Sequence, residues 1–317
     1  MFGRFAPSPT SDLHLGNLRT ALVAWLAARA SGRGFLIRIE DLDQQRVAAA
    51  DGVAERQLAD LASLGLDHDG EVVRQSQRLD HYQKAFERLD RYECFCTRRE
   101  IAEAAQAPHQ DGFRPYPGTC RDLTERQRAQ RRRERSPAWR VRAGAAPVHV
   151  VDLLCGPVTM PVDDFVLRRG DGTFGYHLAV VVDDAAQGVD QVVRGDDLLS
   201  STPRHVWLAQ ALGLEPVREY LHVPLAVNAK GVRLAKRDRA VSLAELTATG
   251  WRPSQVLAWL GASLGLCRPE EPVTPEQLLD RFDLSRLPRT PWWSPDQHIS
   301  PCRQTGCRRR RPWSHRP

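Results

Sequence analysis

Short apolar runs and stretches with a helical hydrophobic period alternate along the first part of the chain. Apolar runs at Gly3–Ala6 and at 35–41 predict two strands. Between them, apolar residues from Leu18 to Leu26 recur on one helical face. The order strand, helix, strand predicts a β-α-β unit, and such units form parallel sheets.

Two more helices are predicted directly after this unit, at 53–65 and 78–90. In the second, the residues that recur at helical spacing are expected to form a buried stripe: Leu79, Tyr82, Phe86 and Leu89. From about residue 91 to residue 172 the chain changes character and becomes rich in arginine, cysteine and loop-forming residues. A charged helix is predicted there at 123–135, with short strands at 138–143 and 148–154.

Regular α/β alternation resumes after residue 172. Strands are predicted at 179–184, 189–195 and 220–227, and a helix is predicted between Ser201 and Gly213. Helical patterns then close the chain at 242–250, 254–265 and 274–282. We therefore predict one α/β domain with a parallel sheet, divided as follows: first half 1–92, insertion 93–172, second half 173–240, helical region 241–292, and a disordered basic tail 293–317.

Composition adds loose bounds. The chain has 317 residues, of which 42% are hydrophobic and 26% charged, and no apolar run approaches the roughly 18 residues that a membrane-spanning helix needs. With no leader-like start, a cytoplasmic enzyme without membrane contact is expected. Six arginines and no acid lie in 301–317, which accounts for the whole net charge of +6. Bulk basicity is therefore weak evidence for an RNA partner.

The segment RFAPSPTSDLHLGN joins the first predicted strand to the first helix. Such a turn presents unpaired N–H groups and the positive end of a helix to an anion, and Gly16 allows close approach to the backbone. His14 and Asn17 add side-chain donors for phosphate oxygens. The alternative is that His14 caps the helix and Gly16 merely fits the turn.

A second basic element, NAKGVRLAKRDRAVSL, follows the last predicted strand. Taken alone, this run of lysines and arginines is typical of a solvated loop. A cationic loop in this place could also close over a triphosphate and neutralise the departing pyrophosphate.

Three of the seven cysteines are grouped in the insertion. Cys94 and Cys96 stand one residue apart, and Cys120 follows in YPGTC. Three thiolates with one further ligand make a tetrahedral zinc site, but three unrelated buried thiols give the same spacing. Cys155 and Cys267 are expected to be core residues.

Five segments occur together in the order found in glutamyl-tRNA synthetases: RFAPSPTSDLHLGN, RIEDLD, GYHLAVVVDD, VVRGDDLLSSTPRH and RLAKR. HLGN stands where class I synthetases carry their HIGH motif, and RLAKR where they carry KMSKS. The chain thus resembles this family over residues 3–290, which implies a Rossmann-type catalytic domain with an acceptor-binding type of insertion.

Within the group, the chain is most similar to the glutamyl-Q tRNA(Asp) synthetases, paralogues that lack the anticodon-binding half. It ends soon after the helices that follow RLAKR, and we expect no further domain. Val180 stands where full-length glutamyl enzymes usually have asparagine, and the cysteine pattern fits the paralogues.

The resemblance implies a glutamate site. Arg4 and Arg194 provide two guanidinium groups for two carboxylates, and Glu40 accepts from the substrate ammonium. Without the family pattern, Arg194 and Glu40 would be interpreted as a structural ion pair at a sheet edge. The implied glutamate-binding residues are Arg4, Phe5, Ala6, Pro7, Ser8, Glu40, Tyr176 and Arg194.

ATP with Mg²⁺ is implied at the two motifs. His14, Gly16 and Asn17 would bind the phosphates together with Arg233 and Lys236, and His14, Asn17 and Lys236 would be catalytic. RLAKR matches KMSKS only at Lys236, whereas Arg233 stands in place of the first lysine and keeps its charge.

For the insertion, the resemblance implies one structural zinc ion held by Cys94, Cys96, Tyr116 and Cys120, with His109 as an alternative ligand. Arginines of 130–135, with Arg140 and Arg142, are candidates for contacts with tRNA phosphates.

The implied reaction joins L-glutamate to ATP as glutamyl-adenylate and passes the glutamyl group to queuosine at the wobble position of tRNA(Asp). A monomer is expected. Two alternatives stay open: a truncated glutamyl-tRNA synthetase that charges the 3′ end of tRNA(Glu), and a non-catalytic tRNA- or nucleotide-binding paralogue.

Overall fold

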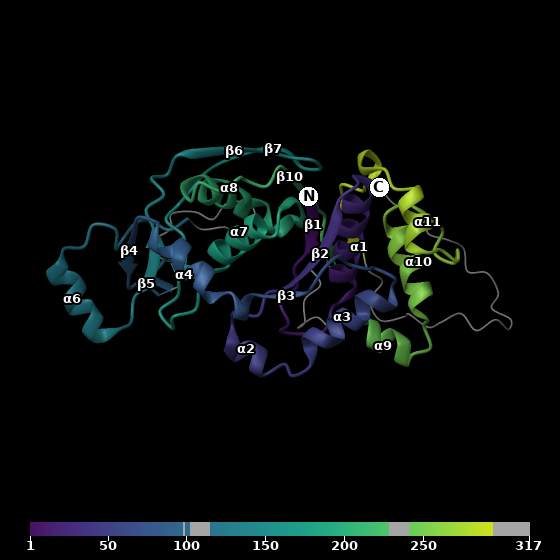
Figure 1. Ribbon diagram of the computed structural model, residues 1–317, viewed down its shortest axis with the longest axis horizontal. Coiled ribbons are helices and arrows are strands. Elements are labelled where there is room, and N and C mark those ends of the chain that lie inside the picture. The colour runs from purple at the N-terminus through teal and green to yellow at the C-terminus, as the bar shows by residue number, and fades with distance from the viewer. Residues whose placement is uncertain (98, 102–114, 228–240, 294–317) are drawn as a thin grey trace.

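The computed structural model describes residues 1–97, 99–101, 115–227 and 241–293. A mostly parallel sheet of seven strands lies at its centre, in the order β3-β2-β1-β9-β10-β6-β7 (Figure 1). Only the last pair, β6 with β7, is antiparallel. The strands are β1 (Phe2–Phe5), β2 (Gly34–Ile39), β3 (Val73–Arg74), β6 (Pro147–Asp152), β7 (Gly156–Pro161), β9 (Val189–Gly195) and β10 (Glu219–Val223).

Helices cover both faces of this sheet. On one face α1 (Leu15–Ala30) packs with α3 (Val53–Ser63), α10 (Pro253–Ser263) and α11 (Pro275–Asp280) in one apolar core. A second core joins α4 (Leu79–Glu87), α7 (Tyr176–Ala186) and α8 (Thr202–Ala211). Figure 1 shows α1, α10 and α11 on one side of β1 and β2, with α7 and α8 on the other. The predicted α/β class and the first β-α-β unit are therefore correct.

Helix α1 is buried around nearly its whole circumference, and not only on the predicted apolar face. Its small residue Ala28 packs against Gly3 of β1, while α10 and α11 cover the side that faces away from the sheet. The predicted stripe of α4 is only partly correct. Tyr82 and Phe86 are buried, whereas Leu79 at the start of the helix is 48% exposed.

The strand predicted at 179–184 is wrong, because these residues belong to helix α7. The valine run has the composition of a strand, but local propensity is a weak preference that tertiary packing overrides. Asp183 and Asp184, which follow the valine run, lie on this helix and contact different partners. Asp183 accepts from Tyr82 at 2.7 Å, and Asp184 accepts from Arg4.

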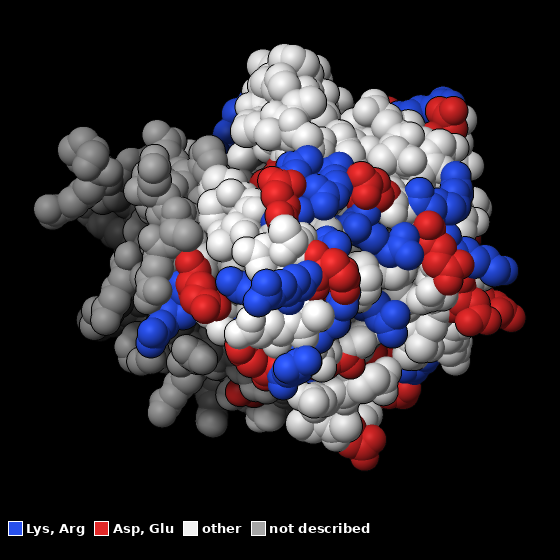
Figure 2. All heavy atoms as spheres, turned by 90° about the vertical axis from the view of Figure 1, so that its left-hand side faces the viewer, with Lys and Arg blue, Asp and Glu red and all other residues white. Residues whose placement is uncertain are grey.

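A smaller antiparallel sheet lies beside the main one, with the order β4 (Arg91–Cys94), β5 (Ala138–Val141) and β8 (Val166–Arg168). The arginine-rich helix α6 (Glu125–Glu134) has no buried residue and is linked to β4 by an ion pair between Arg132 and Glu93. Figure 2 shows basic and acidic side chains interspersed on this side of the molecule. Arg132, for example, pairs with both Glu93 and Glu125.

Arg140 does not fit its predicted contact with tRNA phosphate. It is 7% exposed, donates to the carbonyl oxygen of Asp164 at 2.7 Å, and lies 3.7 Å above the ring of Tyr116. A buried guanidinium held in this way supports the small sheet and does not face solvent.

The predicted insertion contributes to the main sheet. Strand β6 pairs in parallel with β10 through Asp152 and Tyr220, so the β6–β7 hairpin extends the sheet. Cys155 next to this hairpin is exposed, contrary to its prediction as a core residue, and Cys267 is half-buried. The remaining elements are α2 (Gln44–Ala48), β11 (Ala226–Val227), α9 (Leu243–Ala248) and β12 (Trp292–Trp293).

Within the described residues, no helix combines the length and apolar character needed to cross a bilayer.

Candidate active site

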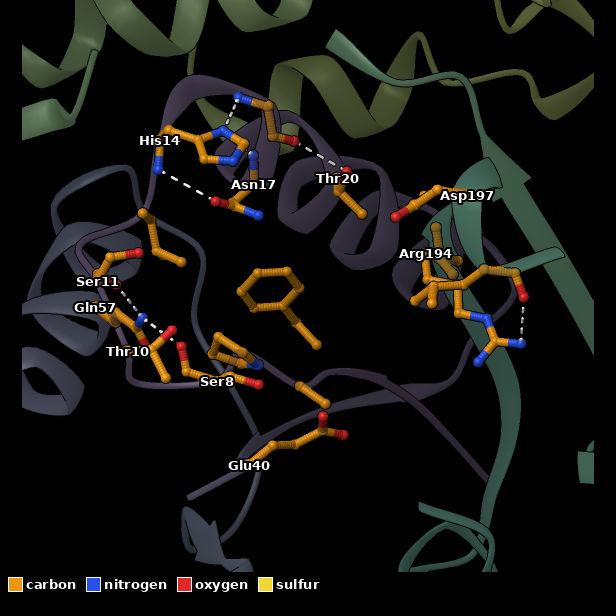
Figure 3. Close-up of a pocket in the computed structure, with 18 of the residues that line it drawn as sticks. Ser8, Thr10, Ser11, His14, Asn17, Thr20, Glu40, Gln57, Arg194 and Asp197 are labelled. Carbon is orange, nitrogen blue, oxygen red and sulfur yellow. Dashed lines mark hydrogen bonds between the residues drawn. The ribbon is translucent and has the colours of Figure 1, made fainter. Parts of the chain in front are cut away.

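A cavity of about 900 Å³ opens at the carboxyl ends of β1 and β9 and at the N-terminus of α1. Figure 3 shows His14 and Asn17 at one end of this cavity, Glu40 at the other, and Arg194 at the side. The carboxyl edge of a parallel sheet is the usual place for a ligand in such folds. The predicted glutamate- and ATP-binding residues that the structure describes all line this one cavity: Arg4, Phe5, Ala6, Pro7, Ser8, His14, Gly16, Asn17, Glu40, Tyr176 and Arg194.

At the α1 end, His14 caps the helix. Its Nδ1 accepts from the backbone N–H groups of Gly16 and Asn17 at 3.1 and 3.3 Å, and the Asn17 side chain accepts from the His14 N–H at 3.3 Å. Because Nδ1 accepts, a neutral His14 ring carries its proton on Nε2. The capping alternative is correct, and it fixes the ring at the mouth of the helix without excluding contact with an anion.

Gly16 stands in the tightest part of this turn. A Cβ atom there would lie 3.0 Å from the His14 ring and 3.1 Å from the Ala226 side chain. A Cβ atom at this position would therefore require the His14 ring or the Ala226 side chain to shift slightly.

Arg4 approaches the cavity from β1 and is paired with carboxylates. Its Nε and Nη2 donate to the two oxygens of Asp184 at 3.3 and 3.4 Å. Arg38 on β2 lies 2.8 Å from the same carboxylate. Burial alone would raise the pKa of Asp184, but the two arginines outweigh it and lower that pKa. Asp184 is therefore an anion shared by two cations.

Arg194 on β9 has different surroundings. It is 5% exposed, and its partners are the neutral side chains of Tyr176, Thr202, His205 and His222 and one carbonyl oxygen. In the part of the chain that the structure describes, Arg194 makes no ion pair. Its positive charge is thus not cancelled by an adjacent carboxylate.

Glu40 directly follows β2 and has an 11% exposed side chain, 3.8 Å from Arg38. Burial raises its pKa to about 7, against the opposing charges of Arg38 and Arg4. The backbone N–H of Glu40 donates to Pro7 at 2.9 Å, which ties this strand end to the turn. A cationic ligand group beside Glu40 would favour the ionised carboxylate.

Sequence reasoning missed several residues that shape this cavity. Gln57 is 1% exposed and donates to the carbonyls of Ser8 and Ser11 at 3.2 and 2.7 Å, which holds the turn. Arg38 and Asp184 orient Arg4. The available signal was a charged residue within an apolar run: Arg38 in FLIRIED, and the acids that end VVVDD.

The cysteine cluster lies in the small sheet. The sulfur atoms of Cys94, Cys96 and Cys120 lie within 4.8 Å of one another. The Tyr116 hydroxyl is 3.4 Å from the Cys94 sulfur and 3.7 Å from the Cys96 sulfur. Tetrahedral zinc with bonds of about 2.3 Å places its sulfur ligands roughly 3.8 Å apart, so the cluster is compatible with zinc.

Three predicted residues lie outside the described part of the chain. They are Arg233 and Lys236 of the RLAKR segment, and His109, the alternative metal ligand.

Comparison with known proteins agrees with this arrangement. The family model for tRNA synthetases class I (E and Q), catalytic domain, matches residues 2–300. A protein of Nocardia farcinica named Glutamyl-Q tRNA(Asp) synthetase is 60% identical over 295 residues, covering 92% of each chain. One of the same name from Cutibacterium acnes is 55% identical over 289 residues, covering 91% of this chain and 82% of its own.

Among solved structures, a glutamate tRNA ligase from Elizabethkingia meningosepticum in complex with its amino acid superposes with a TM-score of 0.74 at 26% identity. The match covers 92% of this chain and 66% of that one, so this chain spans about two thirds of the ligase. The glutamate-tRNA synthetase of Elizabethkingia anophelis gives a TM-score of 0.75 at 27% identity, over 93% of this chain and 68% of its own.

The sequence match over nearly the whole chain and the shared fold lead to one conclusion: the chain belongs to the family of class I tRNA synthetases (E and Q).

Proposed function

We propose that this chain activates L-glutamate with ATP and transfers the glutamyl group to the queuosine base at the wobble position of tRNA(Asp). One observation carries the proposal. Relatives named Glutamyl-Q tRNA(Asp) synthetase are 60% and 55% identical to the chain over 92% and 91% of its length. The residues that line the cavity supply chemistry suited to the first step.

The glutamate would lie between Glu40 and the two buried arginines. Arg4 and Arg194 attract its two carboxylates, and Glu40 accepts hydrogen bonds from its ammonium group. The Tyr176 hydroxyl accepts from Arg194 at 3.1 Å and offers its own proton to the ligand. This charge pattern selects a small molecule with two negative groups and one positive group.

ATP would place its phosphates at the N-terminus of α1. The helix end, the Nε2–H of His14 and the amide of Asn17 are donors without a fixed positive charge. Lys236 and Arg233 would add positive charge near the departing pyrophosphate. Mg²⁺ bound to the ATP neutralises phosphate charge when present.

In the first step, an oxygen of the α-carboxylate forms a bond to the α-phosphorus of ATP while the bond from that phosphorus to pyrophosphate breaks. No side chain acts as a nucleophile. The rate therefore depends on in-line positioning and on charge stabilisation by His14, Asn17 and Lys236.

In the second step, a hydroxyl of the queuosine cyclopentenediol attacks the activated carbonyl and AMP leaves. An anticodon loop can present such a base splayed out from its neighbours. The carboxyl edge of the sheet, where the cavity opens, is the surface at which the base would enter.

A zinc ion in the small sheet completes the proposal. Cys94, Cys96, Cys120 and the Tyr116 oxygen would hold it as a closed structural site, which would supply a cross-link between β4 and the segment that contains Tyr116. No step of the reaction passes through this ion.

The RNA that accepts the glutamyl group can be identified by incubating the wild-type protein with labelled glutamate, ATP and one RNA at a time. The three RNAs are queuosine-containing tRNA(Asp), the same tRNA without queuosine, and tRNA(Glu). We expect label only on the first. Label on tRNA(Glu) alone would replace the proposal with a truncated glutamyl-tRNA synthetase. Absence of glutamate-dependent ATP–pyrophosphate exchange would replace it with a non-catalytic binding protein.

A further inference from the structure

Every N–H group of Arg194 has an acceptor, and every acceptor is neutral. A guanidinium group carries five N–H donors, one on Nε and two on each terminal nitrogen. The five contacts are Nε to His222 Nε2 at 2.9 Å, Nη1 to the Tyr176 hydroxyl at 3.1 Å and to His205 Nδ1 at 3.3 Å, and Nη2 to Leu198 O at 3.2 Å and to Thr202 Oγ1 at 2.8 Å.

One branch of this network runs from β10 to the β6–β7 hairpin. The ring Nδ1 of His222 lies 2.6 Å from Asp152 at the end of β6. Asp152 also accepts from the backbone N–H groups of Leu154, Cys155 and His222. These donors stabilise the ionised carboxylate, which holds a proton on His222 Nδ1 and leaves the Nε2 lone pair for Arg194.

The second branch runs through two histidines. Because Arg194 donates to His205 Nδ1, a neutral His205 carries its proton on Nε2, which lies 3.0 Å from Nδ1 of His177. Burial lowers the pKa of His177 to about 3, and it lowers that of His205 well below its usual value, with Arg194 adding to the effect. Both rings are therefore neutral at physiological pH.

We propose that Asp152, His222 and His205 are positioning residues, which hold Arg194 as a hydrogen-bonded cation without an adjacent carboxylate so that its charge serves a substrate carboxylate. The Tyr176 hydroxyl would connect Arg194 with the substrate carboxylate, because it accepts from Arg194 and can donate its own proton toward the cavity. The inference rests on the proposed function, because it takes glutamate to be the substrate.

Neutral imidazoles suit this task for a physical reason. A carboxylate in the place of either ring would fix the guanidinium equally well, but it would cancel the positive charge in a buried site. An apolar residue would leave buried N–H groups without acceptors, which is unfavourable. Imidazoles satisfy the donors and leave the charge in place.

The test uses two substitutions at one position. His205→Leu removes the acceptor, whereas His205→Asn keeps an acceptor oxygen near the place of Nδ1. We expect His205→Leu to raise the KM for glutamate about tenfold in ATP–pyrophosphate exchange with kcat within about twofold, and His205→Asn to stay within about threefold of wild type. Asp152→Asn should raise the same KM. The exposed His149 gives the matched control, His149→Leu, which should change nothing.

Two further measurements separate positioning from loss of fold. The KM for ATP should stay unchanged in each variant, and the thermal unfolding midpoint, although lowered by the lost hydrogen bond, should stay above the assay temperature. The inference is overturned if His205→Leu binds glutamate as wild type does, or if His205→Asn is as impaired as His205→Leu.

A second measurement is independent of activity. Nitrogen NMR of histidine-labelled protein should show the proton of His222 on Nδ1 and those of His205 and His177 on Nε2. The opposite tautomers, or charged rings at neutral pH, contradict the network even if the wild type activates glutamate. Failure of the wild type to activate glutamate with these tautomers present counts against the proposed function and not against the network.

Discussion

The two sides of the cavity treat a buried arginine in opposite ways. On the β1–β2 side, Arg4 shares the carboxylate of Asp184 with Arg38, so most of its charge is balanced within the protein. On the β9–β10 side, Arg194 is held by hydroxyl, imidazole and carbonyl groups. The difference teaches that burial and hydrogen bonding do not by themselves reveal what a cation does. The charge of its partners indicates how much of its own charge is left for a ligand.

The largest effect is expected from Arg194→Met, which removes the cation that pairs with no carboxylate among the residues that the structure describes. We expect kcat/KM for glutamate in pyrophosphate exchange to fall about a thousandfold, because a buried charged hydrogen bond is worth up to about 4 kcal/mol. The thermal midpoint should also fall, because the five buried acceptors lose their donor, so the kinetics are measured well below it. Arg268→Met, at an exposed arginine in the helical region, is the control and should keep full activity. Normal activity of the Arg194→Met variant would contradict the proposed difference between Arg4 and Arg194.

Asp184→Asn should act chiefly on stability. It leaves Arg4 and Arg38 in a buried site without their shared anion, and removing one partner of a buried ion pair costs about 3–5 kcal/mol. Denaturant unfolding measures this loss. A matched change, Asp67→Asn, removes one of the two carboxylate partners of Arg29 at an exposed aspartate and should cost under about 1 kcal/mol. Equal losses for the two variants would show that Arg4 is not anchored by Asp184.

Glu40 makes the β2 side sensitive to pH. Because burial raises its pKa to about 7, it becomes protonated as the pH falls through neutrality and loses its attraction for the substrate ammonium. The KM for glutamate should therefore rise about tenfold between pH 8 and pH 6, while the ammonium itself stays charged. Glu40→Gln should have a high KM that no longer depends on pH over this range. A wild-type KM that is flat from pH 8 to pH 6 would contradict the role of Glu40.

The smallest effect on glutamate activation is expected outside the cavity. Cys96→Ser should lose bound zinc, measured as metal per protein, and should lower the unfolding midpoint, because structural zinc stabilises its local fold. Activation should stay within about threefold of wild type, since the cluster lies in the small sheet. Cys155→Ser, at an exposed cysteine, should keep its zinc. If the Cys96→Ser variant retained its zinc, Cys96 would not be a ligand and the proposed zinc site would be wrong.

The sequence allowed much of the fold and of the site to be predicted. The β-α-β unit follows from hydrophobic periodicity, and the resemblance identified Arg4, Glu40, Tyr176 and Arg194, which the structure brings into one cavity. The opposite characters of Arg4 and Arg194 were not predictable. Each depends on which partners the fold brings to the arginine, and sequence distance hides them: Asp184 lies 180 positions from Arg4.

Two features explain why the remaining partners were missed. A valine run before Asp184 favoured a strand, which would have pointed Asp183 and Asp184 to opposite faces of a sheet. Asp152 lay in a segment assigned to the insertion, although its hairpin joins the main sheet beside β10. Both errors concern tertiary packing, which local pattern does not encode.

The identity of the acceptor tests the central claim most directly. Queuosine-containing tRNA(Asp) from which the 3′-terminal adenosine has been removed keeps its cyclopentenediol but has lost the ribose hydroxyls of an ordinary charging reaction. With labelled glutamate and ATP, we predict that the wild-type protein labels this trimmed tRNA as fully as the intact one. Loss of labelling on trimming would show that the glutamyl group goes to the 3′ end and would contradict the account.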